Sequence, residues 1–150
     1  MSEVSCFDRA VKLLSLRSHF ELELRAKLQK RSYSSDDIDA AIERCVEFGY
    51  LDDAKTAQEF ARAKRARGGW GRRKVEAELR RRGVSGEALQ DALEEDEDGE
   101  LERAFRAAEK AARRRDDRDS IARHLSGKGF SPHVILTVLD RRGQSEDEAF

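Results

Sequence analysis

The sequence predicts an all-α protein, an elongated array of three tandem three-helix repeats with about nine short helices in all. Three observations predict this fold class. Ala, Leu, Arg and Glu dominate, and Pro132 is the only proline, so the composition favours helices over sheets. One apolar pattern occurs three times, at intervals of 51 and 46 residues. Charged residues make up 41 % of the chain, against roughly 25 % in ordinary globular proteins, which indicates a thin core.

The repeat has seven aligned positions, and six of the seven columns keep their chemical type in all three copies. The copies are Leu24, Leu28, Ser32, Tyr33, Ser34, Ile38 and Ile42; Val75, Leu79, Gly83, Val84, Ser85, Leu89 and Leu93; and Ile121, Leu125, Gly129, Phe130, Ser131, Ile135 and Leu139. Apolar residues four apart share one helix face. The glycines stand where a helix ends in the left-handed conformation, for which Ser32 is a poorer choice.

The residues after this stop predict the start of the next helix. Each copy has a serine whose hydroxyl can accept a hydrogen bond from a first-turn amide, namely Ser34, Ser85 and Ser131. Pro132 follows the third serine, and proline is favoured at the first helical position. The apolar residue before each serine is expected to pack across the junction.

An additional amphipathic helix precedes each helix pair. Its apolar positions are Phe7, Ala10, Val11 and Leu14; then Ala57, Phe60 and Ala61; then Leu101, Ala104, Phe105, Ala108, Ala111 and Ala112. The second of these helices is expected to end at Gly68-Gly69. We predict repeats over residues 1–52, 53–95 and 96–143 and an acidic tail over 144–150. The alternative is one irregular all-α bundle.

Several classes of protein are disfavoured by what the sequence lacks. No segment has the roughly 20 apolar residues of a membrane-spanning helix, and no signal peptide precedes the first repeat. Phosphate-binding glycine loops, the nucleophilic-serine motif and the zinc-protease motif are absent. We therefore expect no enzyme activity, no cofactor, no metal and no membrane partner.

The cysteines and histidines do not form a recognisable site. Cys6 and Cys45 are too few for a disulfide framework or a four-cysteine zinc site. We expect both to be small apolar packing residues in a reducing cytosol. His19, His124 and His133 lack the spacing of a helical metal site, and we expect them at surface or half-buried helix positions.

Charge is sorted along the chain, although the formal net charge is only −1. Residues 60–82 contain ten Lys and Arg against two acids, residues 87–102 nine acids and no base, and residues 103–123 eight bases against four acids. Arg outnumbers Lys 22 to 8, and guanidinium groups suit bidentate pairing with phosphate or carboxylate. The run over residues 94–98 is expected to be an exposed acidic linker, or a competitor for the basic residues.

A helix over residues 72–82 would carry a basic stripe opposite its apolar pair, Val75 and Leu79. We take nine residues as the candidate surface for binding a partner or a nucleic acid: Arg62, Arg65, Arg67, Arg72, Arg73, Lys74, Arg80, Arg81 and Arg82. The ligand would be a phosphate backbone or an acidic protein groove. A solvated helix face is the alternative, but the stripe lacks the usual Glu partners. Trp70 is expected in the core, with a stacking contact as the alternative.

These residues resemble the RecX family of bacterial regulators of the RecA recombinase. The resemblance is carried by Gly49-Tyr50-Leu51-Asp52-Asp53, Phe60-Ala61, Gly69-x-Gly71 and Val75-x-x-Glu78-Leu79-x-x-x-Gly83-Val84, with further similarity on both sides. It covers about residues 7–142. Two positions depart from the family pattern: Phe20 replaces a serine N-cap, so that Ser18 is expected to cap instead, and Ser32 replaces a glycine.

The resemblance implies three tandem three-helix repeats and binding in the groove of the RecA–single-stranded-DNA filament. It implies a monomer that inhibits ATP hydrolysis and strand exchange by RecA and limits the SOS response, and some members also bind DNA directly. A general nucleic-acid-binding helical protein that acts independently of RecA is the alternative.

Overall fold

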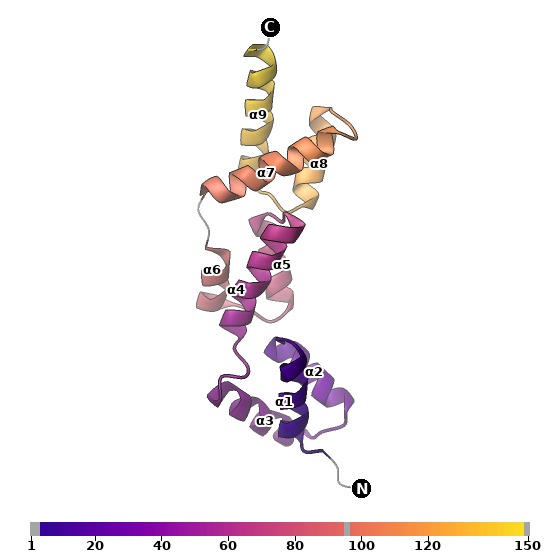
Figure 1. Cartoon of the computed structure of the whole chain (residues 1–150), viewed down its shortest axis with the longest axis vertical. Coiled ribbons are helices and arrows are strands. Elements are labelled where there is room, and N and C mark those ends of the chain that lie inside the picture. Colours follow the sequence, from indigo (N-terminus) through magenta and orange to yellow (C-terminus); the bar gives the residue numbers. More distant parts are fainter. Residues whose placement is uncertain (1–3, 95–96, 149–150) are drawn as a thin grey trace. The chain divides into compact units, whose positions relative to one another are not determined.

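The computed structural model describes residues 4–94 and 97–148, and in these ranges the chain forms nine α-helices and no strand (Figure 1). The helices are α1 (Cys6–Leu16), α2 (Glu21–Lys30), α3 (Ser35–Glu47), α4 (Asp53–Ala63), α5 (Arg72–Arg81), α6 (Gly86–Leu93), α7 (Glu97–Ala112), α8 (Arg118–Gly127) and α9 (Pro132–Glu148). A short π-helix, η1 (Lys64–Gly68), follows α4. The predicted all-α repeat fold is confirmed.

Helices α2, α5 and α8 end with the same backbone turn. The residues at the stop have φ of 66° at Ser32, 91° at Gly83 and 94° at Gly129. In each copy the amide of the next residue donates to a carbonyl of the preceding helix. The bonds run from Tyr33 to Leu28 at 3.4 Å, from Val84 to Leu79 at 2.9 Å and from Phe130 to Leu125 at 3.2 Å. This is the Schellman turn that the glycine columns predict, and Ser32 adopts it despite its side chain.

Two of the predicted serine caps are seen directly. The Ser34 hydroxyl accepts from the Asp37 amide at 3.1 Å, and the Ser131 hydroxyl accepts from the Val134 amide at 3.4 Å. Each bond satisfies a first-turn donor that the helix itself leaves unpaired.

The start of α2 corrects the prediction that Ser18 is its cap. The Glu21 amide donates to Oδ1 of Asp53 at 2.8 Å, and the Phe20 amide donates to Oε1 of Glu23 at 3.3 Å. The Ser18 hydroxyl instead lies 3.5 Å from a carboxylate oxygen of Glu59. A carboxylate from the start of α4 therefore does what a serine at position 20 would do, since it satisfies a first-turn amide of α2.

The chain divides into two compact units: Met1–Glu59 with Leu79–Ala92, and Phe60–Glu78 with Leu93–Phe150. Helices α4 and α5 each contribute residues to both units. The units are therefore a different division of the chain from the three repeats.

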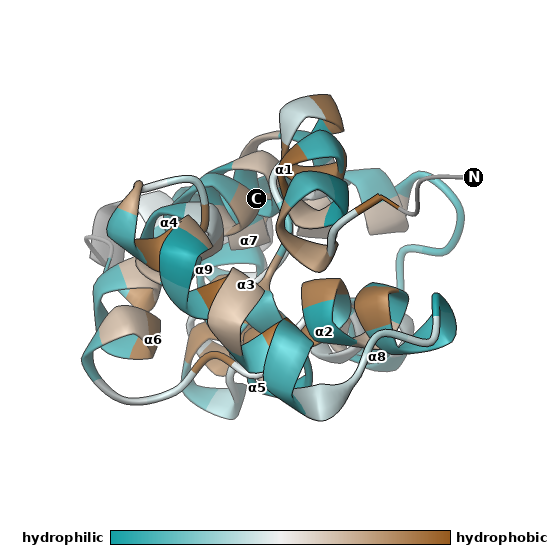
Figure 2. Cartoon of the chain, turned by 90° about the horizontal axis from the view of Figure 1, so that it is seen from below, coloured by the Kyte–Doolittle hydropathy of each residue, from teal (hydrophilic) through white to brown (hydrophobic). Residues whose placement is uncertain are grey.

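The first unit packs α1 and α2 against α3. Its core consists of Cys6, Ala10, Leu24, Leu28, Ile38, Ala41, Ile42, Cys45 and Leu51. The two cysteines are buried and unbridged, as predicted, and burial raises the pKa of both thiols. His19 corrects the expectation of a surface or half-buried helix position, because it lies between α1 and α2 and is only 2 % exposed. Bands of hydrophobic and hydrophilic residues mark the two faces of α1 in Figure 2.

In the second unit α7 lies across α8 and α9 (Figure 1). The core consists of Ala104, Ala108, Ile121, Leu125, Phe130, Val138 and Leu139. Fully buried alanines on α7 let the larger side chains of α8 and α9 approach its backbone closely. The repeat columns thus supply the core of this unit, as the spacing predicts.

Two predicted segments meet the limits of the described chain. Glu94 is exposed, residues 95–96 of the expected acidic linker lie outside the described residues, and α7 begins at Glu97. The expected tail over residues 144–150 starts inside α9, which continues to Glu148, and residues 149–150 lie outside the described residues.

Candidate functional site

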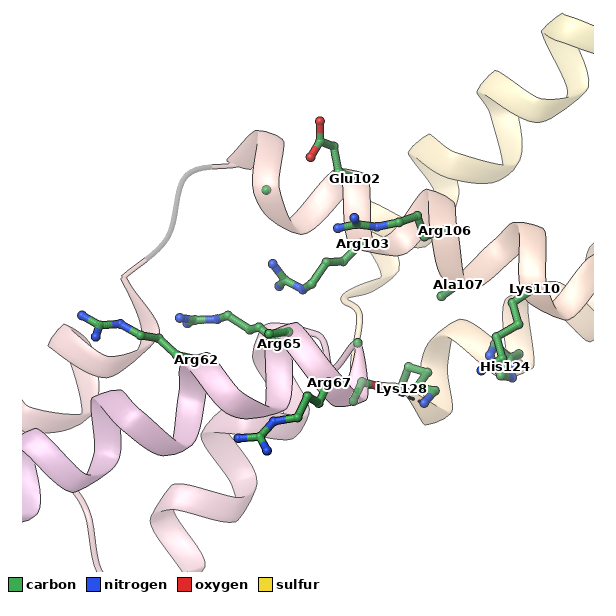
Figure 3. A pocket seen from close by; sticks show the side chains of 14 residues that line it. Arg62, Arg65, Arg67, Glu102, Arg103, Arg106, Ala107, Lys110, His124 and Lys128 are labelled. Atoms are coloured by element: carbon green, nitrogen blue, oxygen red, sulfur yellow. Dashed lines mark hydrogen bonds between the residues drawn. The ribbon is translucent and has the colours of Figure 1, made fainter. Parts of the chain in front are cut away.

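The second unit contains an open pocket of about 680 Å³ whose charged lining residues are mainly cations (Figure 3). Its walls come from the end of α4 with η1, from α7 and from α8. The charged and titratable lining residues are Arg62, Arg65, Arg67, Glu102, Arg103, Arg106, Lys110, His124 and Lys128. Seven are Lys or Arg and one is an acid, and Figure 3 shows that acid, Glu102, pointing away from the guanidinium groups.

The pocket walls are held together where the end of α8 meets the start of α5. The Gly71 amide donates to the Lys128 carbonyl at 2.8 Å, and the Arg73 amide donates to the Gly129 carbonyl at 3.0 Å. The Arg72 amide donates to Oε1 of Glu100 at 3.2 Å. The unpaired amides of α5 thus meet the unpaired carbonyls of α8, and the opposed partial charges of the two helix ends add to these bonds.

This junction requires two glycines. A Cβ on Gly71 would lie 2.5 Å from the Gly129 carbonyl carbon, and one on Gly129 would lie 2.2 Å from Cβ of Lys74. Neither neighbour can yield without moving backbone. Gly71 of the Gly69-x-Gly71 motif and Gly129 of the glycine column are therefore both required by the close approach of these two chain segments.

The turn from residue 68 to 71 is fixed by side chains as well. Nζ of Lys128 donates to the Gly68 carbonyl at 3.1 Å, and Nε of Arg103 donates to the Trp70 carbonyl at 3.2 Å. Arg103 is only 7 % exposed. Two cations of the pocket are therefore built into its frame, and η1 and α7 keep a defined spacing.

Trp70 is half-buried, so the prediction of a core position is correct only in part. Its ring meets the Phe60 ring edge-on, with centroids 6.1 Å apart. The ammonium groups of Lys64 and Lys74 lie 4.9 and 4.5 Å from its centroid. Such cation–π contacts hold both lysines close to the turn.

The structure separates the nine predicted contact residues into groups. Arg62, Arg65 and Arg67 line the pocket. The Arg72 guanidinium donates to the Leu93 carbonyl at 3.0 Å, and Lys74 contacts Trp70, so both have a structural role.

The other four predicted residues belong to α5 and the residue after it. Arg73, Arg80 and Arg81 are exposed on α5, and the Arg82 guanidinium lies 5.9 Å from the Phe20 ring. Their contact with a partner stays a prediction.

Three acids of the third repeat are paired away from the pocket. Arg142 of α9 pairs with Glu109 and with Asp116, and Arg118 pairs with Asp140 at 2.8 Å. None of these residues lines the pocket. Within residues 103–123, the folded chain thus separates these acids from the bases that line the pocket, and the pocket keeps an excess of positive charge.

His124 lies in this cationic surrounding, with the Lys110 side chain extending towards it in Figure 3. Its Nε2 is buried and has no hydrogen-bond partner among the described residues. Burial and the charges of Lys128, Lys110 and Arg114 lower the pKa of the imidazole below its ordinary value. A neutral ring is therefore favoured while the pocket is empty of anions.

Sequence reasoning did not select the pocket residues of the third repeat. Arg103, Arg106 and Lys110 follow one another at intervals of three and four, which places them on one face of α7. That spacing was a usable signal. Lys128 occupies the basic position before each helix stop, but nothing local indicates that it reaches across to Gly68.

The described residues offer neither a metal site nor a membrane-spanning helix. No group of three or more His, Cys, Asp or Glu side chains there could hold a metal ion. No helix within those residues has both the length and the apolar character needed to cross a membrane.

Comparison with known proteins matches the chain to two family models. Residues 6–45 match "RecX, first three-helix domain", and residues 52–93 match "RecX, second three-helix domain". Two curated proteins named "Regulatory protein RecX" match over most of their own length and most of this chain. The protein of Legionella pneumophila is 32 % identical over 138 residues, covering 89 % of this chain and 91 % of its own. The protein of Vibrio vulnificus is 35 % identical over 141 residues, covering 91 % and 92 %.

Solved structures agree on the fold. The crystal structure of RecX from Lactobacillus salivarius superposes with a TM-score of 0.82 at 23 % identity, covering 91 % of this chain and 93 % of that one. The two domain models, these relatives and the order of the quoted motifs lead to one conclusion. The chain belongs to the RecX family.

Proposed function

We propose that this protein regulates the RecA recombinase by binding in the groove of the RecA–single-stranded-DNA filament, where it inhibits ATP hydrolysis and strand exchange and so limits SOS induction. Membership of a family whose relatives are named regulatory proteins carries the proposal. It acts as a monomer, by binding rather than by turnover. RecA is the proposed partner, and no cofactor takes part.

The basic residues support a filament as the target. Arg73 and Arg81 are exposed on α5, and a second group of cations lines the pocket of the second unit. Arginine pairs with phosphate oxygens or carboxylates through charge-assisted hydrogen bonds. A nucleoprotein filament offers both kinds of acceptor.

The proposal is tested by titrating the protein into the DNA-dependent ATPase reaction of RecA. We expect inhibition, together with cosedimentation of the protein with the filament at low salt. The variant Arg73→Glu/Arg81→Glu should inhibit less, because both guanidinium groups are reversed in sign. Lys12→Glu, an exposed lysine of α1 outside the candidate set, is the matched control. If the wild-type chain neither inhibits the ATPase nor cosediments with the filament, the proposal is contradicted.

The alternative is a general nucleic-acid-binding helical protein that acts without RecA. The cation-lined pocket is the observation that favours it. It requires tight binding to naked DNA with a steep salt dependence, in which log K falls by roughly 0.7–0.9 per phosphate contact for each decade of salt. Strong filament binding with much weaker binding to naked DNA decides for the RecA proposal.

A further inference from the structure

The pocket of the second unit collects like charges on several of its walls. Arg62, Arg67 and Arg106 line it, and their side chains make no ion pair within the part of the chain that the structure describes. Solvated charged surfaces of ordinary proteins intersperse both signs. Here cations from three helices converge on one hollow, and their mutual repulsion is relieved when an anion enters.

We propose that this pocket binds the backbone phosphates of a single-stranded nucleic acid and that His124 takes up a proton as it does so. The inference deepens the proposed function and rests on it only for the source of the strand, which is the DNA inside the RecA filament. The pocket itself is expected to bind a free strand.

Charge density favours phosphate over an acidic protein surface. Every nucleotide of a single strand carries one phosphate charge, so a short segment brings several charges and can meet several cations at once. A protein partner would have to place several carboxylate side chains together in the same concave space. Each of those carboxylates would lose hydration and conformational freedom there.

The shape of the site favours a flexible strand over a duplex. The volume of about 680 Å³ lies within the roughly 300–1,000 Å³ of pockets that take small ligands. A single strand can bend a phosphate and its sugar into such a hollow, whereas duplex phosphates lie on a stiff convex surface. The wall includes η1, and π-helical turns frequently occur at functional sites.

The framework of the pocket is formed before any ligand arrives. Lys128 and Arg103 tie the walls together through the carbonyls of Gly68 and Trp70. A binding site that is already ordered spends less free energy on ordering its side chains when the ligand binds.

His124 provides a reporter that belongs to the pocket alone. The charged groups that act on it are Lys128 at the C-cap of its own helix, Lys110 on α7 and Arg114 in the turn after α7. All are cations, so they oppose protonation of the ring. A phosphate brings negative charge and a hydrogen-bond acceptor, which favours the imidazolium, and binding therefore strengthens as the pH falls.

The direct test measures binding of a fluorescein-labelled oligothymidylate by fluorescence anisotropy over a range of salt. Arg106→Glu/Lys110→Glu changes two exposed residues on the α7 wall. We expect at least about tenfold weaker binding and a salt slope reduced by about one to two. Arg113→Glu, an exposed residue just beyond α7 and outside the pocket, is the matched control and should bind within about twofold of wild type. Circular dichroism confirms that each variant folds.

The second readout follows the imidazole protons by NMR. Addition of the oligothymidylate should raise the pKa of His124, while the signals of His133, which lies outside the pocket, do not move. His124→Asn should flatten the pH dependence of affinity. An unchanged His124 signal with the oligothymidylate bound would place the strand elsewhere.

The outcomes separate this inference from the proposed function. Equal oligothymidylate affinity of the wild-type chain and the α7 variant overturns the pocket even if RecA is still inhibited. Equal or tighter binding of poly-glutamate overturns it in favour of an acidic protein partner, and preference for duplex DNA overturns the single-strand assignment. If the α7 variant loses oligothymidylate binding but still inhibits RecA, the result supports the pocket as the strand-binding site. It also shows that RecA regulation does not depend on the pocket.

Discussion

Ser32 shows how one residue can adopt a conformation that its repeat partners assign to glycine. Among the described residues it is the one non-glycine with positive φ, at 66°. A side chain costs about 1–2 kcal/mol in the left-handed region. The surrounding helices impose the turn, because the same amide-to-carbonyl bonds close it in all three repeats.

We expect Ser32→Gly to raise the free energy of unfolding by about 0.5–1 kcal/mol, because glycine removes the strain although it adds some entropy to the unfolded chain. Ser35→Gly is the control, since the same change in the first turn of α3 should lower stability. Urea denaturation measures both. A stability decrease for Ser32→Gly would contradict the assignment of strain.

His19 illustrates a histidine whose two ring nitrogens are both engaged. Nδ1 lies 2.9 Å from the Arg17 carbonyl, and Nε2 lies 2.8 Å from Nζ of Lys27. A carbonyl only accepts and an ammonium only donates, so the ring is neutral with its proton on Nδ1. Burial, with the charges of Arg17 and Lys27, lowers the pKa of the imidazole despite the opposing influence of the Arg17 carbonyl and Glu23.

This lowered pKa predicts a pH dependence of stability. At a pH near the ordinary imidazole pKa, the unfolded chain binds more protons at His19 than the folded chain does. The contribution of His19 to the free energy of unfolding is therefore complete above this pKa and is lost as the pH falls below it. We expect the free energy of unfolding to decrease between pH about 7.5 and about 5.5. His19→Gln should be less stable at the higher pH and should lose the share of this dependence that His19 contributes, while His124, whose pKa is also lowered, keeps its own share. An unchanged slope in the variant would contradict the prediction.

At the scale of the element, first-turn amides of one repeat are capped by a carboxylate of the next. Asp53 accepts from the Glu21 amide at the start of α2, and Glu100 accepts from the Arg72 amide at the start of α5. Glu21 and Arg72 are equivalent positions of the repeat. Asp52 meanwhile caps α4 through the Lys55 amide at 3.1 Å. The two adjacent aspartates thus serve two different helices.

We expect Asp53→Ala to cost about 1 kcal/mol of unfolding free energy, because the Glu21 amide loses its acceptor. Asp53→Asn keeps an acceptor oxygen, and burial raises the pKa of the Asp53 carboxyl, so removing its charge should be tolerated. Thermal or urea unfolding distinguishes the two variants. Equal losses for alanine and asparagine would show that the charge, and not the hydrogen bond, stabilises α2.

The junction between α5 and α8 gives a sharper element-scale prediction. Gly71→Ala places a Cβ against backbone, and we expect a loss of about 2 kcal/mol or more, as for an overpacked core. Gly127→Ala is the control, because it meets nothing within 4 Å and should be neutral or stabilising by up to about 1 kcal/mol. Differential scanning calorimetry compares them. Equal transition temperatures would contradict the close approach at Gly71.

At the scale of the molecule, the exposed ion pairs contribute little to folding. The ion pair of Arg17 with Glu23 at 2.9 Å and that of Arg25 with Asp39 at 2.7 Å involve exposed or half-exposed side chains. Such pairs are worth roughly 0–1 kcal/mol each and are screened by salt. The acids and bases are sorted by position along the chain, and we propose that the exposed cations serve contact with other molecules.

A salt titration should separate these two roles. We expect the urea midpoint to change little from low to high sodium chloride, whereas oligothymidylate affinity falls steeply over the same range. Both are measured on the wild-type chain in the same buffers. A midpoint that drops in parallel with the affinity would show that ion pairs stabilise the fold.

Most of the fold could be predicted because the repeat consists of signals that act between residues close together in the sequence. Apolar residues four apart, a glycine stop and a serine cap each act within a few residues. Ser18 was predicted wrongly as the cap of α2, because the acceptor comes from Asp53, 32 residues away in the chain. The position of His19 was predicted wrongly, because it lies in the turn between two helices and is buried by contacts that only the folded chain makes.

The candidate site could be predicted only in part. Arg62, Arg65 and Arg67 were selected from sequence and do line the pocket. Arg72 and Lys74 were selected on the same grounds but serve the frame, because a basic residue that donates to a carbonyl has the same sequence signature as an exposed one.

The sequence by itself determined the helices, their stops, the repeat columns that become the cores and the sorting of charge into blocks. Only the tertiary structure decided that Gly71 and Gly129 meet, that Arg103, Arg106 and Lys110 face the end of α4, and that Glu109 and Asp116 turn away to Arg142. The physical reason is range. Helix formation and capping depend on neighbours along the chain, whereas the field in a pocket depends on which charges the folded backbone brings together.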